Sequence, residues 1–488
     1  MVITRFAPSP TGSLHIGGLK MALYDFAIAK KNKGKFILRI EDTDQKRFVK
    51  GSEDEIITML NAYNLPYDEI YRQSERLPIY KEYAEKLVEL GAAYYCFTTI
   101  NEIEIMRDKV EQGHQRFVFR SPYRDLPLEQ ARERIAKGES YVIRQKLPEN
   151  LDVEFTDPVQ GLMSFNTNDL DETVLLKSDG FPTYHLAATI DDHLMGITHV
   201  FRGVEWQPSV AKHVLIYKAL GWEMPIISHL TVILDPEGGK LSKRHGSVSA
   251  KEFLDEGYLP EAILNFLMLL GWSTPTEHGY GEKEREIFSL DEFIELFDMK
   301  DVNKASPVFN REKLIWFNQK YIQALKGPEL AKRFMDWFEK HPDFKDLSSK
   351  IEQRGPEYLE KILLLEQTRV KLLKDFTRVM NFFYEFKGNF DFSTVKQTKN
   401  LTPVQLVEFF KEFKNILEKF TDDINNFSHE IEEEFVRQYA DGHQLKAGSL
   451  FMALRLAITD SEFSPPLLEV IKILGKDETI KRIASYIK

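Results

Sequence analysis

The opening stretch of the chain alternates between strand and helix patterns, and this alternation restricts the possible folds more than any other feature. Residues 2–6 are β-prone, a loop rich in Pro, Ser and Gly follows, and residues 19–27 carry apolar side chains at helical spacing before residues 35–40 return to a strand pattern. Strand, helix and strand in this order predict a βαβ unit, whose ligand site lies beyond the carboxyl ends of the strands. We therefore expect ligand groups near residues 7–18 and after Ile40.

The rest of the chain changes pattern several times, so we expect several folding units rather than one. Helical patterns at about 52–64 and 76–90 precede an irregular region rich in charges, Pro and short β-prone runs. The α/β pattern returns at residues 174–177 and continues past Ser247. We predict a multidomain chain in which a Rossmann-type α/β domain is split by an α+β insertion and followed by an all-α region. The predicted boundaries are 1–92 and 184–248 for the α/β domain, 93–183 for the insertion, and 249–322, 323–380 and 381–488 for three helical domains.

The C-terminal third shows the spacing of amphipathic helices. One apolar face consists of Leu406, Phe409, Phe410, Phe413, Leu417 and Phe420. Residues 359–380 are predicted in the same way to form an amphipathic helix, with Arg369, Lys371, Lys374 and Arg378 interleaved among Leu and Phe. A charged helical face is most often only solvated, so this pattern alone does not indicate contact with RNA.

Composition excludes some functional classes. No apolar run reaches the roughly 20 residues needed to cross a bilayer, and the N-terminal residues do not read as a secretory signal, which favours the cytoplasm. Cys96 is the only cysteine, which excludes an internal disulfide and a zinc site built on two or more thiolates. The formal net charge is -11, so a nucleic-acid partner would have to be met by local Lys/Arg patches.

Two loops carry the residue types that bind phosphates. Residues 5–18 read RFAPSPTGSLHIGG, in which two prolines stiffen the loop, glycines allow close approach of a ligand, and His15 stands at the start of a helix. Residues 240–247 read KLSKRHGS and follow two glycines, which predicts a cationic loop suited to a triphosphate. Each loop alone is more readily interpreted as an ordinary turn, but their joint occurrence favours one shared site.

Together these loops resemble the two signature elements of class I aminoacyl-tRNA synthetases, the first being similar to His-Ile-Gly-His with Gly in the last place and the second to Lys-Met-Ser-Lys-Ser. Further segments resemble the glutamyl-tRNA synthetases over essentially the whole chain. They are RFAPSPTG at 5–12, LRIEDTD at 38–44, YRQSER at 71–76, LKSDGFPTYHLA at 176–187, DDH at 191–193, LLEVI at 467–471 and LGK at 474–476. The helical C-terminal half agrees, because the related glutaminyl enzymes have β-barrels there.

The resemblance implies roles for individual residues. The amino-acid site would consist of Arg5, Ala7, Ser9, Glu41, Tyr184 and Arg202. The ATP site would consist of His15, Gly17, Gly18, Lys240, Ser242, Lys243 and Arg244. His15 and Lys243 would stabilise the transition state, and Arg369 would inspect the last anticodon base. Glutamate itself needs two cationic partners and one anionic partner, which Arg5, Arg202 and Glu41 supply. Which arginine takes the side-chain carboxylate stays open, and Glu41 with Arg39 could instead form a surface pair.

The resemblance also implies the reaction and its partners. ATP with Mg²⁺ would activate L-glutamate, and the product would be transferred to tRNA(Glu), which must bind before activation. The helical region would hold the anticodon and form an anticodon-binding region, and the protein would be a cytoplasmic monomer. Whether tRNA(Gln) is also charged stays open.

Some positions depart from the family pattern. A zinc knuckle of some relatives is predicted to be absent, because Cys96 has no second cysteine. Ala188 stands where several relatives have Asn, and Val204 replaces a common acidic residue, so the fine geometry of the pocket is open. Two alternatives remain: a nucleotidyltransferase with the same histidine–glycine architecture, which is usually far smaller, and a catalytically silent RNA-binding paralogue.

Overall fold

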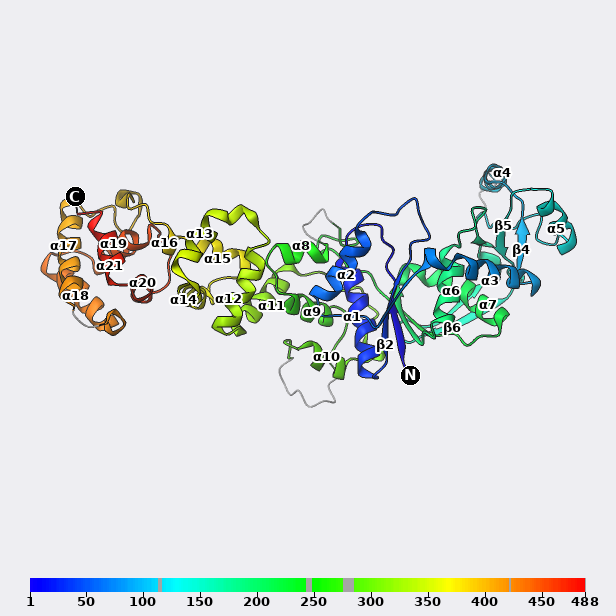
Figure 1. Cartoon of the computed structure of the whole chain (residues 1–488), viewed down its shortest axis with the longest axis horizontal. Coiled ribbons are helices and arrows are strands. Elements are labelled where there is room, and N and C mark those ends of the chain that lie inside the picture. Colours follow the sequence, from blue (N-terminus) through cyan, green and yellow to red (C-terminus); the bar gives the residue numbers. More distant parts are fainter. Residues whose placement is uncertain (113–115, 243–247, 275–284, 421–422, 488) are drawn as a thin grey trace. The chain divides into compact units, whose positions relative to one another are not determined.

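The structure is a computed structural model that describes residues 1–112, 116–242, 248–274, 285–420 and 423–487, with backbone only for 429–431. The chain forms two compact units (Figure 1). The first contains residues 1–254 and 260–314, and the second contains residues 255–259 and 315–488. Each unit is described by itself below.

A parallel five-stranded sheet is the centre of the first unit. Its strands are β1 (Ile3–Phe6), β2 (Lys35–Ile40), β3 (Glu69–Arg72), β9 (His199–Gly203) and β10 (Ile226–Leu230), and the order across the sheet is β10-β9-β1-β2-β3. β1 pairs in parallel with β2 on one side and with β9 on the other. Of these neighbours, β9 and β1 are far apart in sequence, and the carboxyl ends of β1, β2 and β9 meet at one edge, as the βαβ pattern predicted.

Helix α1 (Ile16–Lys31) connects β1 to β2 and is buried on most of its surface, which explains its weak amphipathic pattern. The Nδ1 atom of His15 caps its first turn by accepting a hydrogen bond from the Gly17 N–H at 3.0 Å. Lys30 and Lys31 lie in the last turn, where positive charge complements the helix dipole. The loop before α1 is therefore fixed between a strand end and a capped helix start.

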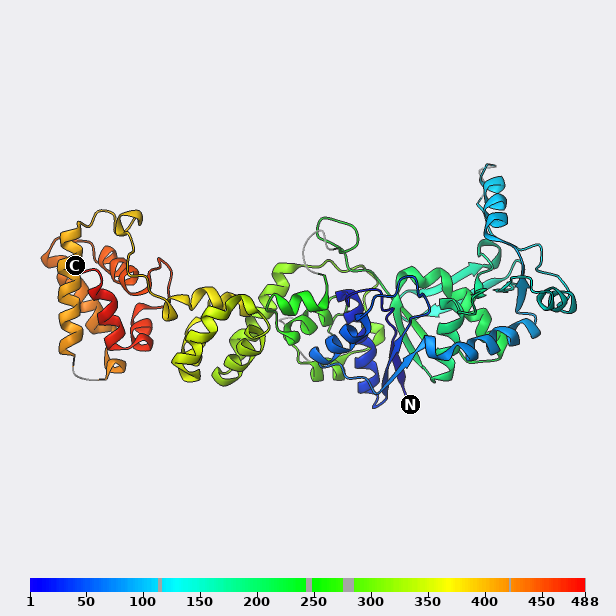
Figure 2. The same ribbon diagram turned by 45° about the horizontal axis from the view of Figure 1, so that its top comes forward.

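The described residues of the predicted insertion form two small antiparallel sheets, two short α-helices and a 3-10 turn. One sheet has the order β4-β5-β8 (Ala93–Cys96, Val142–Gln145, Val174–Leu176), and the other is the hairpin β6-β7 (Asp152–Asp157, Gly161–Asn166). Helices α4 (Ile100–Glu111) and α5 (Leu128–Ala136) lie beside the first of these sheets, on the side away from the five-stranded sheet in both views (Figures 1 and 2).

Helices surround the central sheet of the first unit. They are α2 (Ser52–Ala62), α3 (Leu77–Glu89), α6 (Tyr184–Leu194), α7 (Val210–Leu220), α8 (Ala250–Asp255), α9 (Pro260–Leu269) and α10 (Leu290–Leu296). The predicted helices at 52–64 and 76–90 correspond to α2 and α3. An apolar core of α3, α6 and strands of the β4-β5-β8 sheet includes Leu87, Ile143, Leu175 and Ile190.

The second unit is built from helices, and its described residues contain no strand. The helices are α11 (Arg311–Ala324, which begins in the first unit), α12 (Gly327–Phe338), α13 (Lys345–Arg354), α14 (Pro356–Glu366), α15 (Leu373–Val379), α16 (Asn381–Tyr384), α17 (Pro403–Lys419), α18 (His429–Gly442), α19 (Ala447–Thr459), α20 (Leu467–Leu474) and α21 (Lys476–Ala484). The apolar face predicted for α17 is confirmed for Leu406, Phe409, Phe410, Phe413 and Leu417, which are all buried. Phe420, the sixth predicted residue, lies just beyond the end of the helix and is only partly buried.

One helix prediction was wrong. Residues 359–380 do not form a continuous helix, because α14 ends at Glu366 and α15 begins only at Leu373. The Asp375 carboxylate accepts hydrogen bonds from the N–H groups of Lys371 and Leu372, which starts a new helix. The Gln367 amide donates to the carbonyls of Ile322 and Leu325 and thereby fixes the turn. The break places Arg369 on a loop instead of on a helical face.

Among the described residues, no helix is long and apolar enough to span a membrane.

Candidate active site

The first predicted loop lies at the carboxyl end of β1 and lines two cavities. A cavity of about 270 Å³ contains Ala7, Ser9, His15 and Gly18 in its wall. A second cavity, of about 420 Å³, is lined by His15, Gly17 and Gly18 together with the segment after β10. Because Nδ1 of His15 accepts from Gly17, the proton of the neutral imidazole is on Nε2, which is thus a hydrogen-bond donor.

Hydrogen bonds join the segment directly after the lysine loop to the glycine loop, although the two are more than 200 residues apart in sequence. Ile16 N–H donates to the Val248 carbonyl and Ala250 N–H donates to the Leu14 carbonyl, both at 2.8 Å. Lys240 lines the same 420 Å³ cavity as His15. Ser242 is exposed, and the predicted Lys243 and Arg244 lie outside the described residues. The two signature elements therefore share one cavity wall through Lys240 and His15.

Lys20 is a further cationic group at this cavity that the sequence analysis missed. Its side chain is almost fully buried and lines the 420 Å³ cavity, and its ammonium lies 5.3 Å from the ring centroid of Tyr24. Burial lowers the pKa of Lys20 to about 8. Its position on α1, one turn beyond Gly17, gave no local signal that would separate it from a surface lysine.

A buried cluster of charges lies at the carboxyl ends of β1 and β2. Asp192 Oδ1 accepts from Arg5 Nε at 3.2 Å and from Arg39 Nη1 at 2.6 Å. Arg39 Nη2 donates to Glu41 Oε1 at 3.0 Å. Arg5 Nη1 also donates to the Phe201 carbonyl at 3.4 Å, which connects β1 to β9. Three strands and α6 thus contribute to one polar network inside the protein.

The pKa shifts in this cluster follow from burial and from the neighbouring charges. Burial acts to raise the pKa of Asp192, but Arg39 and Arg5 outweigh it and hold the pKa below its usual value, so the carboxylate stays ionised. For Glu41 burial prevails over the two arginines, and its pKa is raised. A cationic partner at Glu41 would therefore be favoured, because it would compensate a carboxylate that burial disfavours.

Arg202, at the carboxyl end of β9, has a largely buried guanidinium with defined partners. Nη1 lies 3.3 Å from the Tyr184 hydroxyl, and Nη2 donates to the Trp206 carbonyl at 3.3 Å. The rings of Tyr184 and Trp206 pack at a centroid distance of 4.1 Å. Tyr184 begins α6, whose later residue Asp192 holds Arg5 and Arg39, so one helix positions both halves of the site.

The alternative that Arg39 and Glu41 form a surface pair was wrong, because the Arg39 side chain has no exposed area and that of Glu41 is 10% exposed. Asp192 had no predicted role, although the segment 191–193 is one of those that carry the family resemblance. Three further residues were not predicted: His213 and His229, which contact Arg202, and Asp157, which contacts His229. The signal that could have indicated Asp192 is the pair of adjacent aspartates on a helix that packs against the sheet.

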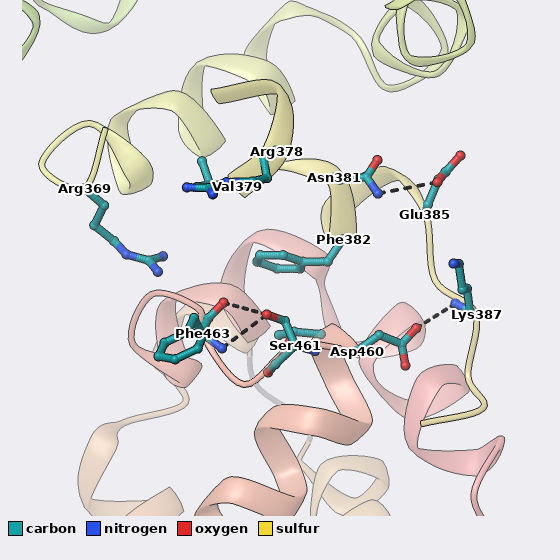
Figure 3. A pocket seen from close by; sticks show the side chains of 11 residues that line it. Arg369, Arg378, Val379, Asn381, Phe382, Glu385, Lys387, Asp460, Ser461 and Phe463 are labelled. Atoms are coloured by element: carbon teal, nitrogen blue, oxygen red, sulfur yellow. Dashed lines mark hydrogen bonds between the residues drawn. The ribbon is translucent and has the colours of Figure 1, made fainter. Parts of the chain in front are cut away.

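The second unit contains a separate pocket of about 500 Å³ around Arg369 (Figure 3). Arg369 and Arg378 come from the segment between α14 and α16, and Asp460, Ser461 and Phe463 come from the loop after α19. The Arg369 guanidinium donates to Glu366 Oε2 at 2.7 Å, and the Phe463 ring is 81% exposed. Arginine and exposed aromatic side chains are the types that read unpaired RNA bases.

Comparison with known proteins agrees with this geometry. The family described as "tRNA synthetases class I (E and Q), catalytic domain" matches residues 1–316, and the family described as "Anticodon binding domain" matches residues 329–487. The glutamate--tRNA ligase of Finegoldia magna is 37% identical over 99% of this chain and 98% of its own length. That of Dehalococcoides mccartyi is 40% identical over 100% and 97%.

Solved structures of similar sequence share the whole fold. A glutamate tRNA ligase from Elizabethkingia meningosepticum, solved in complex with its amino acid, superposes with a TM-score of 0.87 at 37% identity and covers 100% of this chain and 99% of that one. The fold and the paired loops therefore define a class I aminoacyl-tRNA synthetase. Within that class, the full-length similarity shows that the chain belongs to the glutamate–tRNA ligase family.

Proposed function

We propose that this protein activates L-glutamate with ATP and transfers the glutamyl group to the 3′ end of tRNA(Glu), with release of AMP and pyrophosphate. The relatives named as glutamate–tRNA ligases over their full length support this activity. The observation that carries the assignment is the set of charges at the edge of the sheet. Arg5 and Arg202 lie at the carboxyl ends of β1 and β9, and the N–H of Glu41 donates to the Pro8 carbonyl in the loop before His15.

These charges match the substrate one by one. Glutamate carries two carboxylates and one ammonium, so a largely dry pocket needs two cationic donors and one anionic acceptor. We assign Arg5 and Arg202 to the carboxylates, without choosing which takes the side chain, and Glu41 to the ammonium. Ala7, Ser9 and Tyr184 complete the proposed wall. A neutral glutamine would leave the arginine that receives the side chain without the substrate's counter-charge, a mismatch that a site built around a polar pair rejects by about 10⁴ to 10⁵.

The proposed reaction has two steps. The α-carboxylate of glutamate attacks the α-phosphorus of ATP in line, the bond to the β-phosphate oxygen breaks, and pyrophosphate leaves. A terminal ribose hydroxyl of the tRNA then attacks the mixed anhydride, and AMP leaves. No side-chain nucleophile is required, because the protein positions the reactants and stabilises charge. We assign ATP to Gly17, Gly18, Lys240, Ser242, Lys243 and Arg244, and stabilisation of the transition state to His15 and Lys243.

Mg²⁺ is proposed to enter with the nucleotide. The described residues offer no group of three His, Cys, Asp or Glu side chains that would hold a metal ion on the protein alone. Bound to the phosphates, the ion would supply charge neutralisation.

That the protein needs no zinc stays a prediction. The prediction depends on Cys96 being the single cysteine. Its side chain is buried, and Sγ lies 3.3 Å from the Ser121 hydroxyl.

The remaining assignments are proposals of the same kind. We propose the domain division 1–92 with 184–248, 93–183, 249–322, 323–380 and 381–488, a cytoplasmic location and a monomeric state. We propose that Arg369 reads an anticodon base from the pocket of the second unit, where Phe463 offers a face on which an unpaired base could stack.

Aminoacylation assays with purified tRNA(Glu) and tRNA(Gln) test the proposal. We expect charging of tRNA(Glu) with glutamate, and pyrophosphate exchange that requires both glutamate and tRNA. Exchange without any tRNA but with another acceptor substrate would support a nucleotidyltransferase instead. Binding of tRNA with no charging of any tRNA would support a silent paralogue. Charging of tRNA(Gln) with glutamate at a similar rate would show that the enzyme does not discriminate between the two tRNAs.

A further inference from the structure

Two histidines, His229 and His213, contact the guanidinium of Arg202. Nε donates to His229 Nε2 at 2.9 Å, and Nη1 lies 3.2 Å from His213 Nδ1. His213 Nε2 in turn lies 3.2 Å from His185 Nδ1. With the Tyr184 and Trp206 contacts, four of the five N–H groups of Arg202 have partners among the described residues.

The chemistry of arginine fixes the proton positions along this chain. A guanidinium only donates, so His229 Nε2 must accept and the ring proton must be on Nδ1. That Nδ1 lies 2.7 Å from Asp157 Oδ2, and neither side chain has exposed area. Burial lowers the pKa of His229, and the hydrogen bond to Asp157 offsets this only in part, so the imidazole stays neutral. Both hydrogen bonds therefore have a fixed direction: Arg202 Nε donates to His229 Nε2, and His229 Nδ1 donates to Asp157 Oδ2.

Asp157 is itself held from four directions. Its Oδ2 also accepts from the backbone N–H of His229 at 2.9 Å. Its Oδ1 accepts from the N–H groups of Val159 at 2.7 Å and Gln160 at 2.9 Å. The Gln160 amide donates to the His229 carbonyl at 3.0 Å. The turn of the β6-β7 hairpin is therefore hydrogen-bonded to His229 of β10 through both its backbone and its side chain.

We propose that Asp157 and His229 are positioning residues for glutamate binding, acting by holding the Arg202 guanidinium in the orientation that receives a substrate carboxylate. This inference rests on the proposed function, because it assumes that Arg202 binds glutamate. Neither residue contacts the substrate in this role. The consequence is that the amino-acid site depends on the β6-β7 hairpin, an element of the insertion, and not only on the edge of the central sheet.

Three variants separate this role from a general structural one. H229N keeps a donor near the position of Nδ1 for Asp157 but withdraws the acceptor from Arg202, whereas H229Q keeps an acceptor near the position of Nε2. D157N places an amide NH₂ against two N–H donors in either orientation of the side chain. D152N, an exposed position on the same strand β6, is the matched control.

Aminoacylation kinetics at saturating ATP and tRNA(Glu) give the readout. We expect H229N and D157N to raise KM for glutamate about 10- to 100-fold, as for loss of a group that orients a ligand-binding side chain, with kcat and the KM for ATP changed less than about threefold. H229Q should recover most of the glutamate affinity, and D152N should match the wild type. Circular dichroism and thermal unfolding of each variant confirm the fold.

A double-mutant comparison with R202A distinguishes the possible failures. If Arg202 is the residue through which His229 acts, H229N should add no further rise in KM in the R202A background. Additive effects, or wild-type KM in folded H229N and D157N, would overturn the inference and leave the proposed function intact. A wild-type KM for glutamate in R202A itself would instead overturn the proposed glutamate site.

Discussion

Asp192 Oδ1 lies 2.6 Å from Arg39 Nη1, and both side chains are almost completely buried. The same oxygen accepts from Arg5, so one carboxylate on α6 is shared by arginines from two strands. Arginine side chains rarely stand inside a sheet edge without such compensation. The pair therefore explains how two cations are held at the edge of the sheet without access to bulk water.

Replacement of Asp192 should destabilise the first unit. In D192N the two buried guanidinium groups lose their common counter-charge, which is expected to cost about 3 to 5 kcal/mol of unfolding free energy. Urea unfolding of the full-length protein measures the loss. D44N is the control, because Asp44 forms an exposed ion pair with Arg47 and its loss should leave stability near the wild-type value. An equal effect of the two substitutions would contradict this account of the cluster.

Two substitutions of His15 should separate its structural and its catalytic contribution. H15A removes both the helix cap and the imidazole, whereas H15N keeps an acceptor for the Gly17 N–H. We expect about 1 kcal/mol of destabilisation in H15A only, but a loss of about 10² to 10³ in the rate of adenylate formation in both. Single-turnover assays with tRNA present measure that rate. A normal rate in H15N would show that the imidazole is not needed.

Local patterns predicted much of this fold and only part of its site. Strand β2 follows from a short run of buried residues rich in β-prone side chains, and the apolar face of α17 follows from burial at helical spacing; a sequence displays both directly. The association of residues 14–16 with residues 248–250 depends on long-range pairing, which leaves no local trace, so only the joint occurrence of the two loops and the resemblance indicated it.

Buried polar residues were the main omission. Asp157 and His229 stand at strand ends, where polar residues usually face solvent, and their burial depends on partners that lie 72 positions apart in sequence. Arg39 could be interpreted as a surface residue for the same reason: its partner Asp192 lies on α6, 153 positions away in sequence. A single sequence shows that such groups exist but not that they are paired.

Arg369 should affect the choice of tRNA more than the chemistry. R369Q is expected to weaken kcat/KM for tRNA(Glu) by about 1 to 3 kcal/mol, and to reduce the preference for tRNA(Glu) over tRNA(Gln), because the positively charged reader of a base is lost. R437Q, at an exposed ion pair with Glu433 on α18, controls for the general effect of removing one positive charge. Equal losses for both tRNAs in R369Q would indicate a phosphate contact instead of base recognition.

Glu366 should make the stability of the second unit depend on pH. Its side chain is fully buried beneath Arg369, and burial, opposed by Arg369, raises its pKa to about 7. Since the folded pKa lies above the unfolded value of about 4.5, the folded state binds the proton more tightly. The stability that the folded protein gains by binding this proton is therefore fully present below about pH 4.5 and is lost as the pH rises through 7.

The variant E366Q cannot lose this proton, so its stability relative to the wild type should increase by up to about 3 kcal/mol between pH 5 and pH 8. Unfolding by urea at a series of pH values, followed by the helical signal, measures the difference. E418Q, at a more exposed position on α17, should follow the wild-type profile. Parallel pH profiles of E366Q and the wild type would show that Glu366 keeps the same pKa in the folded and unfolded chain.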